Sequence, residues 1–78
     1  MPIKSASDAP ASEHLIFARR LKEARKEIGL SQGRLSELAG LDRSYISNLE
    51  RGSANPSLLK MSQLARIVGR SVSDLLRG

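Results

Sequence analysis

The sequence predicts an all-α fold of five short helices. Apolar residues recur at intervals of three and four along successive segments, a spacing that places them on one face of a helix. Cap residues and glycines separate these segments, and none shows the two-residue alternation of a half-buried strand. The 78 residues suffice for one domain with a small core, so a symmetric partner would add useful stability.

The N-terminal segment differs in composition from the rest of the chain. Residues 1–12, MPIKSASDAPAS, combine two prolines with small polar residues and show no hydrophobic period. This composition predicts a disordered tail, and the folded domain is expected over residues 13–78.

The first helix is expected to begin near Ser12 and to end at Gly29. Residues of its expected core face recur at helical spacing: Phe17, Leu21, Ala24 and Ile28. Basic residues on the opposite face are interpreted as a solvated surface, because amphipathic helices usually turn charge toward water: Arg19, Lys22 and Lys26.

Residues 31–52 hold two further short helices joined by a turn. Ser31 can cap the first helix by accepting a hydrogen bond from a free backbone N–H, and Gly40 can end it in the left-handed conformation. The apolar face of this helix comprises Leu35, Leu38 and Ala39. The pattern then repeats, with Asp42 as the next cap and Gly52 at the next helix end. Two helices joined by a short glycine turn describe a helix-turn-helix.

Two more helices complete the predicted domain. Ser57 can cap the fourth, whose apolar stripe runs to Gly69 and comprises Leu58, Met61, Leu64, Ala65 and Val68. Ser73 is expected to cap a final short helix. The apolar residues in and before this last helix exceed what one core needs, so they predict a dimer surface: Val72, Leu75 and Leu76.

The predicted third helix, residues 42–51, has one apolar face and one polar face. At roughly 100° per residue, Ile46 and Leu49 lie opposite a polar arc formed by Arg43, Ser44, Ser47, Asn48 and Arg51. Arginine can contact guanine O6 and N7, asparagine can contact adenine N6 and N7, and serine suits either base. Acidic Glu50 falls outside this arc, beside the core side.

Charge and composition narrow the class of partner. Thirteen Lys and Arg against eight Asp and Glu give a net charge of +5, which favours a polyanion, nucleic acid first and an anionic membrane second. The absence of cysteine excludes disulfides and thiolate metal sites. The longest apolar run, residues 15–18, is far shorter than the ~20 residues of a membrane span, and with no signal peptide an intracellular, cytoplasmic protein is expected.

Catalytic and metal-binding patterns are missing from the sequence. His14 has no second histidine and no convergent carboxylate cluster. The chain contains no Gly-rich phosphate loop, no HExxH motif and no Ser/His/Asp set with an evident cleft. We therefore expect no enzymatic activity, no metal, no cofactor and no small-molecule ligand.

The segment SQGRLSELAGLDRSYISNLERG, residues 31–52, resembles the helix-turn-helix of the lambda-repressor-like, or xenobiotic-response-element (XRE), transcriptional regulators. The likeness continues through NPSLLKMSQLARIVGRSVSDLL and covers everything after the tail. More narrowly, LDRSYIS followed by NLERGSANPSL resembles the controller proteins of restriction–modification systems. The resemblance implies a five-helix DNA-binding domain.

The resemblance also implies roles for individual residues. Four residues match positions that such regulators use for base edges: Arg43, Ser44, Ser47 and Asn48. Tyr45 matches a tyrosine that approaches DNA in controller proteins, although its ring could equally cover the edge of the core. Gln32 matches a glutamine that contacts phosphate and supports the recognition helix. The full set assigned to the DNA backbone is Ser31, Gln32, Arg51, Ser53 and Asn55.

Four positions depart from the family pattern. Ser36 replaces a usual alanine and adds a hydroxyl that needs a partner. Gly33 weakens its helix by about 1 kcal/mol relative to alanine, unless close approach to DNA explains it. Arg70 stands where an aliphatic residue is usual, and Ala54 where controller proteins often carry a basic residue.

Sequence-specific regulation of transcription is the expected function. A homodimer would place the third helix of each subunit in successive major grooves of a pseudo-palindromic operator. Bound there, it would block RNA polymerase or recruit it. Two alternatives stay open: an antitoxin-like autorepressor that also binds a partner protein, and a non-catalytic interaction module or membrane-surface binder.

Overall fold

The computed structural model describes the backbone of residues 2–77 and the side chains of residues 13–77. This part of the chain contains five helices and no strand, which confirms the predicted all-α class. The helices are α1 (Pro2–Glu27), α2 (Gln32–Ala39), α3 (Arg43–Glu50), α4 (Leu58–Ile67) and α5 (Val72–Leu75).

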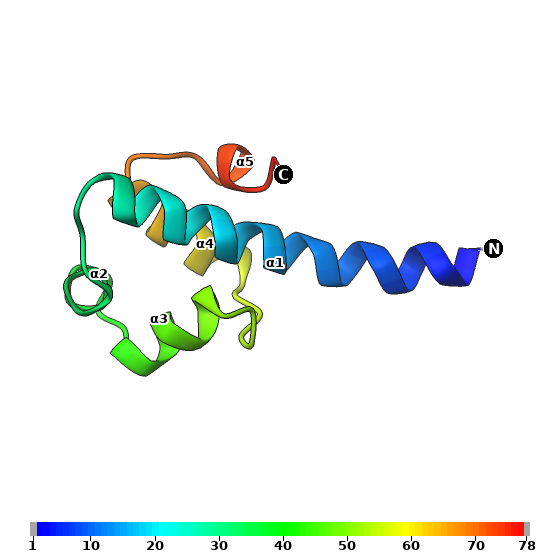
Figure 1. Ribbon diagram of the computed structural model, residues 1–78, viewed down its shortest axis with the longest axis horizontal. Coiled ribbons are helices and arrows are strands. Elements are labelled where there is room, and N and C mark those ends of the chain that lie inside the picture. Colours follow the sequence, from blue (N-terminus) through cyan, green and yellow to red (C-terminus); the bar gives the residue numbers. More distant parts are fainter. Residues whose placement is uncertain (1, 78) are drawn as a thin grey trace.

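Helix α1 is the longest element and organises the others. Figure 1 shows α5 on one side of α1 and α3 on the other, while the N-terminal half of α1 extends beyond the bundle. The helix begins at Pro2, earlier than the predicted start near Ser12, and proline is tolerated at a first helical position because its missing N–H has no partner there. The backbone of residues 2–12 is helical here, and the side chains of these residues lie outside the described part of the chain. The disordered tail predicted over residues 1–12 stays a prediction.

All five helices contribute to one hydrophobic core. Its largest fully buried side chains are Phe17, Leu21, Leu35, Ile46, Leu49, Leu64 and Leu75. Three residues of the predicted apolar faces are instead exposed: Ile28 at 54 %, Leu38 at 49 % and Leu58 at 66 %. Ile28 follows the end of α1, where the chain turns through Gly29 at φ 70°. Leu38 lines a surface hollow between α2 and α4.

Helix caps agree with the prediction at Ser31, Ser57 and Gly40, and they differ at Ser73 and in part at Asp42. Ser31 Oγ accepts from Arg34 N at 3.0 Å, and Ser57 Oγ accepts from Lys60 N at 3.2 Å. Gly40 ends α2 with φ 68°. The prediction of Ser73 as the last cap is wrong. Ser71 has the extended backbone of a cap, and its Oγ accepts from Asp74 N at 3.1 Å.

Asp42 stands at the N-cap position of α3 with the extended backbone of a cap. Its side chain makes no capping hydrogen bond, so the predicted position is correct and the predicted contact is not made. The Asp42 carbonyl oxygen instead accepts from Tyr45 N at 3.0 Å and from Ile46 N at 3.2 Å, so backbone hydrogen bonds close the first turn of α3.

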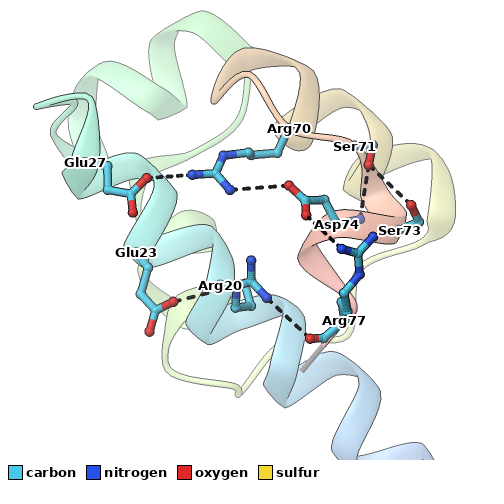
Figure 2. Close-up of polar contacts among 8 residues, drawn as sticks. All are labelled: Arg20, Glu23, Glu27, Arg70, Ser71, Ser73, Asp74 and Arg77. Carbon is cyan, nitrogen blue, oxygen red and sulfur yellow. Dashed lines mark hydrogen bonds and ion pairs between the residues drawn. The ribbon is translucent and has the colours of Figure 1, made fainter.

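Charged side chains tie the C-terminal segment to α1 (Figure 2). Arg70 Nη2 donates to Glu27 Oε1 at 2.6 Å, and Arg70 Nη1 donates to Asp74 Oδ2 at 3.3 Å. Arg20 Nη1 donates to the Arg77 carbonyl oxygen at 3.3 Å. An aliphatic residue at this position would make an apolar contact. Arg70 instead forms a polar bridge between α1 and α5.

Candidate nucleic-acid interface

Helix α3 is anchored by its apolar face and presents its polar face outward. Ile46 and Leu49 have no exposed side-chain surface and lie in the core. Arg43 and Ser44 are exposed at the start of the helix, while Ser47 and Asn48 are partly exposed one turn later. The geometry agrees with the polar arc predicted from the sequence.

A buried ion pair fixes the other end of α3. Arg25 of α1 donates to Glu50 from Nε at 2.7 Å and from Nη2 at 2.9 Å, and the two side chains are 8 % and 2 % exposed. Such a two-bond contact between guanidinium and carboxylate fixes orientation as well as distance. Arg25 Nη1 also donates to the Leu30 carbonyl oxygen at 2.7 Å, so the turn after α1 joins the same network.

Gln32 connects the start of α2 to this network. Its Nε2 donates to Glu50 Oε1 at 3.0 Å, so α1, α2 and α3 meet at one carboxylate. This contact agrees with the predicted role of Gln32 in holding α3 in place. Its contact with a DNA phosphate stays a prediction, as does that of Ser31, whose hydroxyl already accepts the capping bond.

Sequence reasoning missed Arg25 and left Glu50 without a partner. Arg25 follows Ala24 directly, at the margin of the apolar stripe of α1, and Glu50 borders the apolar face of α3. The sequence signal that could have identified this pair is a basic residue beside the core face of one amphipathic helix and an acidic residue beside the core face of another.

Small residues allow α2 and α3 to lie close together. A Cβ atom placed on Gly33 would lie 3.8 Å from Arg43 Cδ, so the Arg43 side chain passes over the first turn of α2. Ser36 is buried, and its Oγ donates to the Gly33 carbonyl oxygen at 2.7 Å. The hydroxyl that departs from the family pattern therefore has its partner within α2.

Arg51, just after α3, folds back over the polar face. Its Nη1 donates to Ser47 Oγ at 3.0 Å, and its Nη2 donates to Asn48 Oδ1. The structure thus brings together one residue assigned to the DNA backbone and two assigned to base edges.

The loop after α3 holds Ser53 and Asn55 on the surface. Gly52 has φ 83°, and Ser53 N donates to the Asn48 carbonyl oxygen at 2.8 Å, which closes the helix end. His14 Nε2 lies 3.3 Å from the Gly52 carbonyl oxygen, so the loop is held against α1. Ser53 and Asn55 are both exposed, and Asn55 lines a surface hollow together with His14, Met61 and Leu76.

Tyr45 packs against the hydrophobic core and is only partly exposed. Burial raises the pKa of its hydroxyl above the ordinary value. The packing supports the interpretation of Tyr45 as a cover for the core edge, and its contact with DNA stays a prediction.

The predicted dimer surface needs a correction. Leu75 has no exposed surface and belongs to the core of its own chain, so it is not available to a second subunit. Periodicity placed it on the correct helix but did not show that the short α5 turns this residue inward. Val72 and Leu76 pack against the same core and keep part of their surface exposed.

Metal ligands are not clustered in the described part of the chain, where no group of three or more His, Asp or Glu side chains could hold an ion. Of the helices that the structure describes, none is long and apolar enough to cross a membrane.

Comparisons with known proteins agree with this geometry. The model of a family described as "Helix-turn-helix" matches residues 21–75. The regulator DdrOP3 of Deinococcus deserti is 47 % identical over 65 residues, which cover 80 % of this chain and 48 % of DdrOP3. The regulator PuuR of Escherichia coli is 38 % identical over 64 residues, which cover 82 % of this chain and 35 % of PuuR. The chain thus spans half or less of the length of these two regulators.

Solved structures show the same arrangement of helices. The restriction–modification controller protein C.AhdI of Aeromonas hydrophila has a TM-score of 0.74 and 42 % identity, with 80 % of this chain and 94 % of that chain covered. Hydroxypropylphosphonic acid epoxidase of S. wedmorenis has a TM-score of 0.78 at 23 % identity, and only 35 % of that enzyme is covered. The likeness to the epoxidase concerns the fold alone.

Proposed function

Because the chain belongs to the helix-turn-helix family of XRE-type transcriptional regulators, we propose that it binds specific double-stranded DNA sites as a homodimer. The observation that carries the proposal is the mounting of α3. Ile46 and Leu49 hold one face in the core, the Arg25–Glu50 pair fixes the C-terminal end, and the opposite face is polar. A helix held in this way enters the major groove as a rigid probe.

Base contacts are assigned to the outward face of α3. Arg43, at the exposed start of the helix, would donate to guanine O6 and N7, and the other candidates are Ser44, Ser47, Asn48 and Tyr45. Backbone contacts are assigned to Ser31, Gln32, Arg51, Ser53 and Asn55, all of them at least partly exposed. The net charge of +5 supports association with a polyanion.

Two copies would place their α3 helices about 34–36 Å apart, one turn of DNA, on a pseudo-palindrome. We propose residues 13–78 as the binding domain, acting in the cytoplasm. Occupancy of the operator would block RNA polymerase or, from an upstream site, recruit it. The likeness to C.AhdI, of which this chain covers 94 %, supports a controller-type regulator over an antitoxin.

Selection of bound sequences from random duplexes tests the proposal. Wild-type protein is expected to enrich one two-fold symmetric motif. Arg43→Ala should relax one base position in each half-site at a cost of about 1–3 kcal/mol, because one specific contact is lost. Ser53→Ala should weaken all sequences alike, because backbone contacts carry no base information.

Arg66→Ala is the matched control, since it removes an exposed arginine of α4 and the same charge. It should leave the base preferences unchanged. Failure of the wild-type protein to enrich any motif would refute the proposed function.

A further inference from the structure

The side chain of Arg51 forms hydrogen bonds with Ser47 and Asn48, two residues on the outward face of α3. It donates to Ser47 Oγ at 3.0 Å and to Asn48 Oδ1. Arg51 itself is exposed, and these two contacts hold its side chain over the helix. The contact changes what Ser47 and Asn48 can offer to a base.

The chemistry of the three groups decides which atoms stay available. A guanidinium has five N–H donors and no acceptor, so Asn48 can meet it only through Oδ1. This orients the amide and leaves the two N–H groups of Nδ2 free to donate. Ser47 Oγ likewise accepts from Arg51, which leaves its own hydroxyl hydrogen free to donate. The positive charge against Oδ1 disfavours approach of a second donor to that oxygen.

We infer that Arg51 is a specificity-determining positioning residue, which makes this part of α3 a surface that offers donors in preference to acceptors. Such a surface matches base edges that carry acceptors. Guanine presents two acceptors, O6 and N7, in the major groove and no donor, whereas adenine presents one acceptor and one donor. The inference rests on the proposed function and names the class of base edge that Asn48 recognises.

Without Arg51, Asn48 would behave differently. A free asparagine amide offers one donor and one acceptor together, which is the pattern that pairs with adenine N6 and N7. Removal of the Arg51 guanidinium is therefore expected to change the preferred base, at the position that Asn48 contacts, from guanine to adenine. An arginine that merely contacted phosphate would not produce this exchange.

The test repeats the selection from random duplexes with four proteins. Asn48→Ala identifies the contacted position, because that position alone should relax. Wild-type protein should enrich guanine there. Arg51→Ala should shift the ratio of adenine to guanine at that position by at least about fivefold, the lower end for one good base contact. Arg66→Ala removes the same charge from α4 and should leave the ratio unchanged.

Asn48→Asp gives a second measurement that keeps the contact with Arg51. The carboxylate still accepts from the guanidinium but has no N–H to donate, so the preference for guanine should disappear. Circular dichroism of each variant checks that the helices are retained. Loss of guanine preference in both Arg51→Ala and Asn48→Asp would support the inference by two different routes.

Three outcomes would overturn the inference. Wild-type protein could already enrich adenine at the position that Asn48→Ala relaxes. Arg51→Ala could weaken all sequences alike and leave the base preference unchanged, as expected for a phosphate contact. In both cases an enriched motif would still support the proposed function. If the wild-type protein enriched no motif, the proposed function would fail and the inference with it.

Discussion

Glu50 is the residue at which three helices meet. Glu50→Gln would leave the Arg25 guanidinium, with its side chain 8 % exposed, without a carboxylate. Breaking one side of a buried ion pair typically costs about 3–5 kcal/mol, because the remaining charge is buried and uncompensated. We expect Glu50→Gln to lower the free energy of unfolding by about 3 kcal/mol in a urea titration.

The control for this variant removes both charges. Arg25→Met combined with Glu50→Leu leaves no charge buried and keeps similar volumes, so it should cost much less than the single substitution. The double variant should keep the helices but lose the fixed orientation of α3. A double variant at least as unstable as Glu50→Gln would contradict this account of the pair.

Ionisation of the Tyr45 hydroxyl is expected to lower the stability of the protein at high pH. Burial raises the pKa of its hydroxyl, so the folded state keeps the proton where the unfolded chain has begun to lose it. The resulting stability is fully present below about pH 10, the ordinary tyrosine pKa, and is lost as pH rises through the folded value. Between about pH 9 and 11, the wild type should therefore lose more stability than Tyr45→Phe in parallel urea titrations. Equal losses would argue against burial of the hydroxyl.

The start of α5 depends on one hydroxyl. Ser71→Ala removes the acceptor for Asp74 N and should lower the free energy of unfolding by about 1 kcal/mol, as is typical for a lost N-cap. Ser73→Ala is the control, because Ser73 lies inside α5, caps no backbone N–H and loses only the 3.3 Å contact of its Oγ with Ser71 Oγ. A larger effect of Ser73→Ala, measured by thermal unfolding, would restore Ser73 as the cap.

The first turn of α2 contains a helical glycine with room for a side chain. A Cβ on Gly33 would meet Arg43 Cδ at 3.8 Å, an ordinary contact distance. Gly33→Ala should therefore raise the free energy of unfolding by about 0.5–1 kcal/mol, because alanine loses less entropy in a helix. DNA affinity of the same variant tests the alternative role: a stabilised protein with weakened binding would show that Gly33 admits the DNA backbone.

Helix bounds and turns were predictable where the chemistry is local. Ser31, Gly40 and Ser57 act within a few residues of their own positions, and the structure confirms all three. Ser71 and Ser73 have the same side chain and both stand near the start of α5, so only the backbone conformation selects between them. The Arg25–Glu50 pair joins residues far apart in sequence, and no local pattern records such a contact.

At the scale of the whole molecule, periodicity identified apolar faces but not which residues the other helices cover. Ile28, Leu38 and Leu58 fit their stripes and are nevertheless exposed. Leu75 is fully buried because α5 packs on both α1 and α4. The polar face of α3 was predictable from the sequence of the helix. The hydrogen bonds from Arg51 to Ser47 and Asn48 were not, because they depend on how the side chains are arranged in the structure.

The proposed homodimer would link this small domain to an operator of two half-sites. Val72 and Leu76 keep partly exposed apolar surface at α5, and a second apolar surface lies at the start of α4, where Leu59 is 80 % exposed. If the α5 surface forms the dimer, Leu76→Asp should raise the dimer dissociation constant at least about tenfold, or about 1.4 kcal/mol, in sedimentation equilibrium. Leu59→Asp adds the same charge to α4 and should leave dimerisation unchanged. If only Leu59→Asp dissociated the dimer, the interface would lie at α4 and not at α5. A wild-type monomer at concentrations that saturate the operator would refute the homodimer.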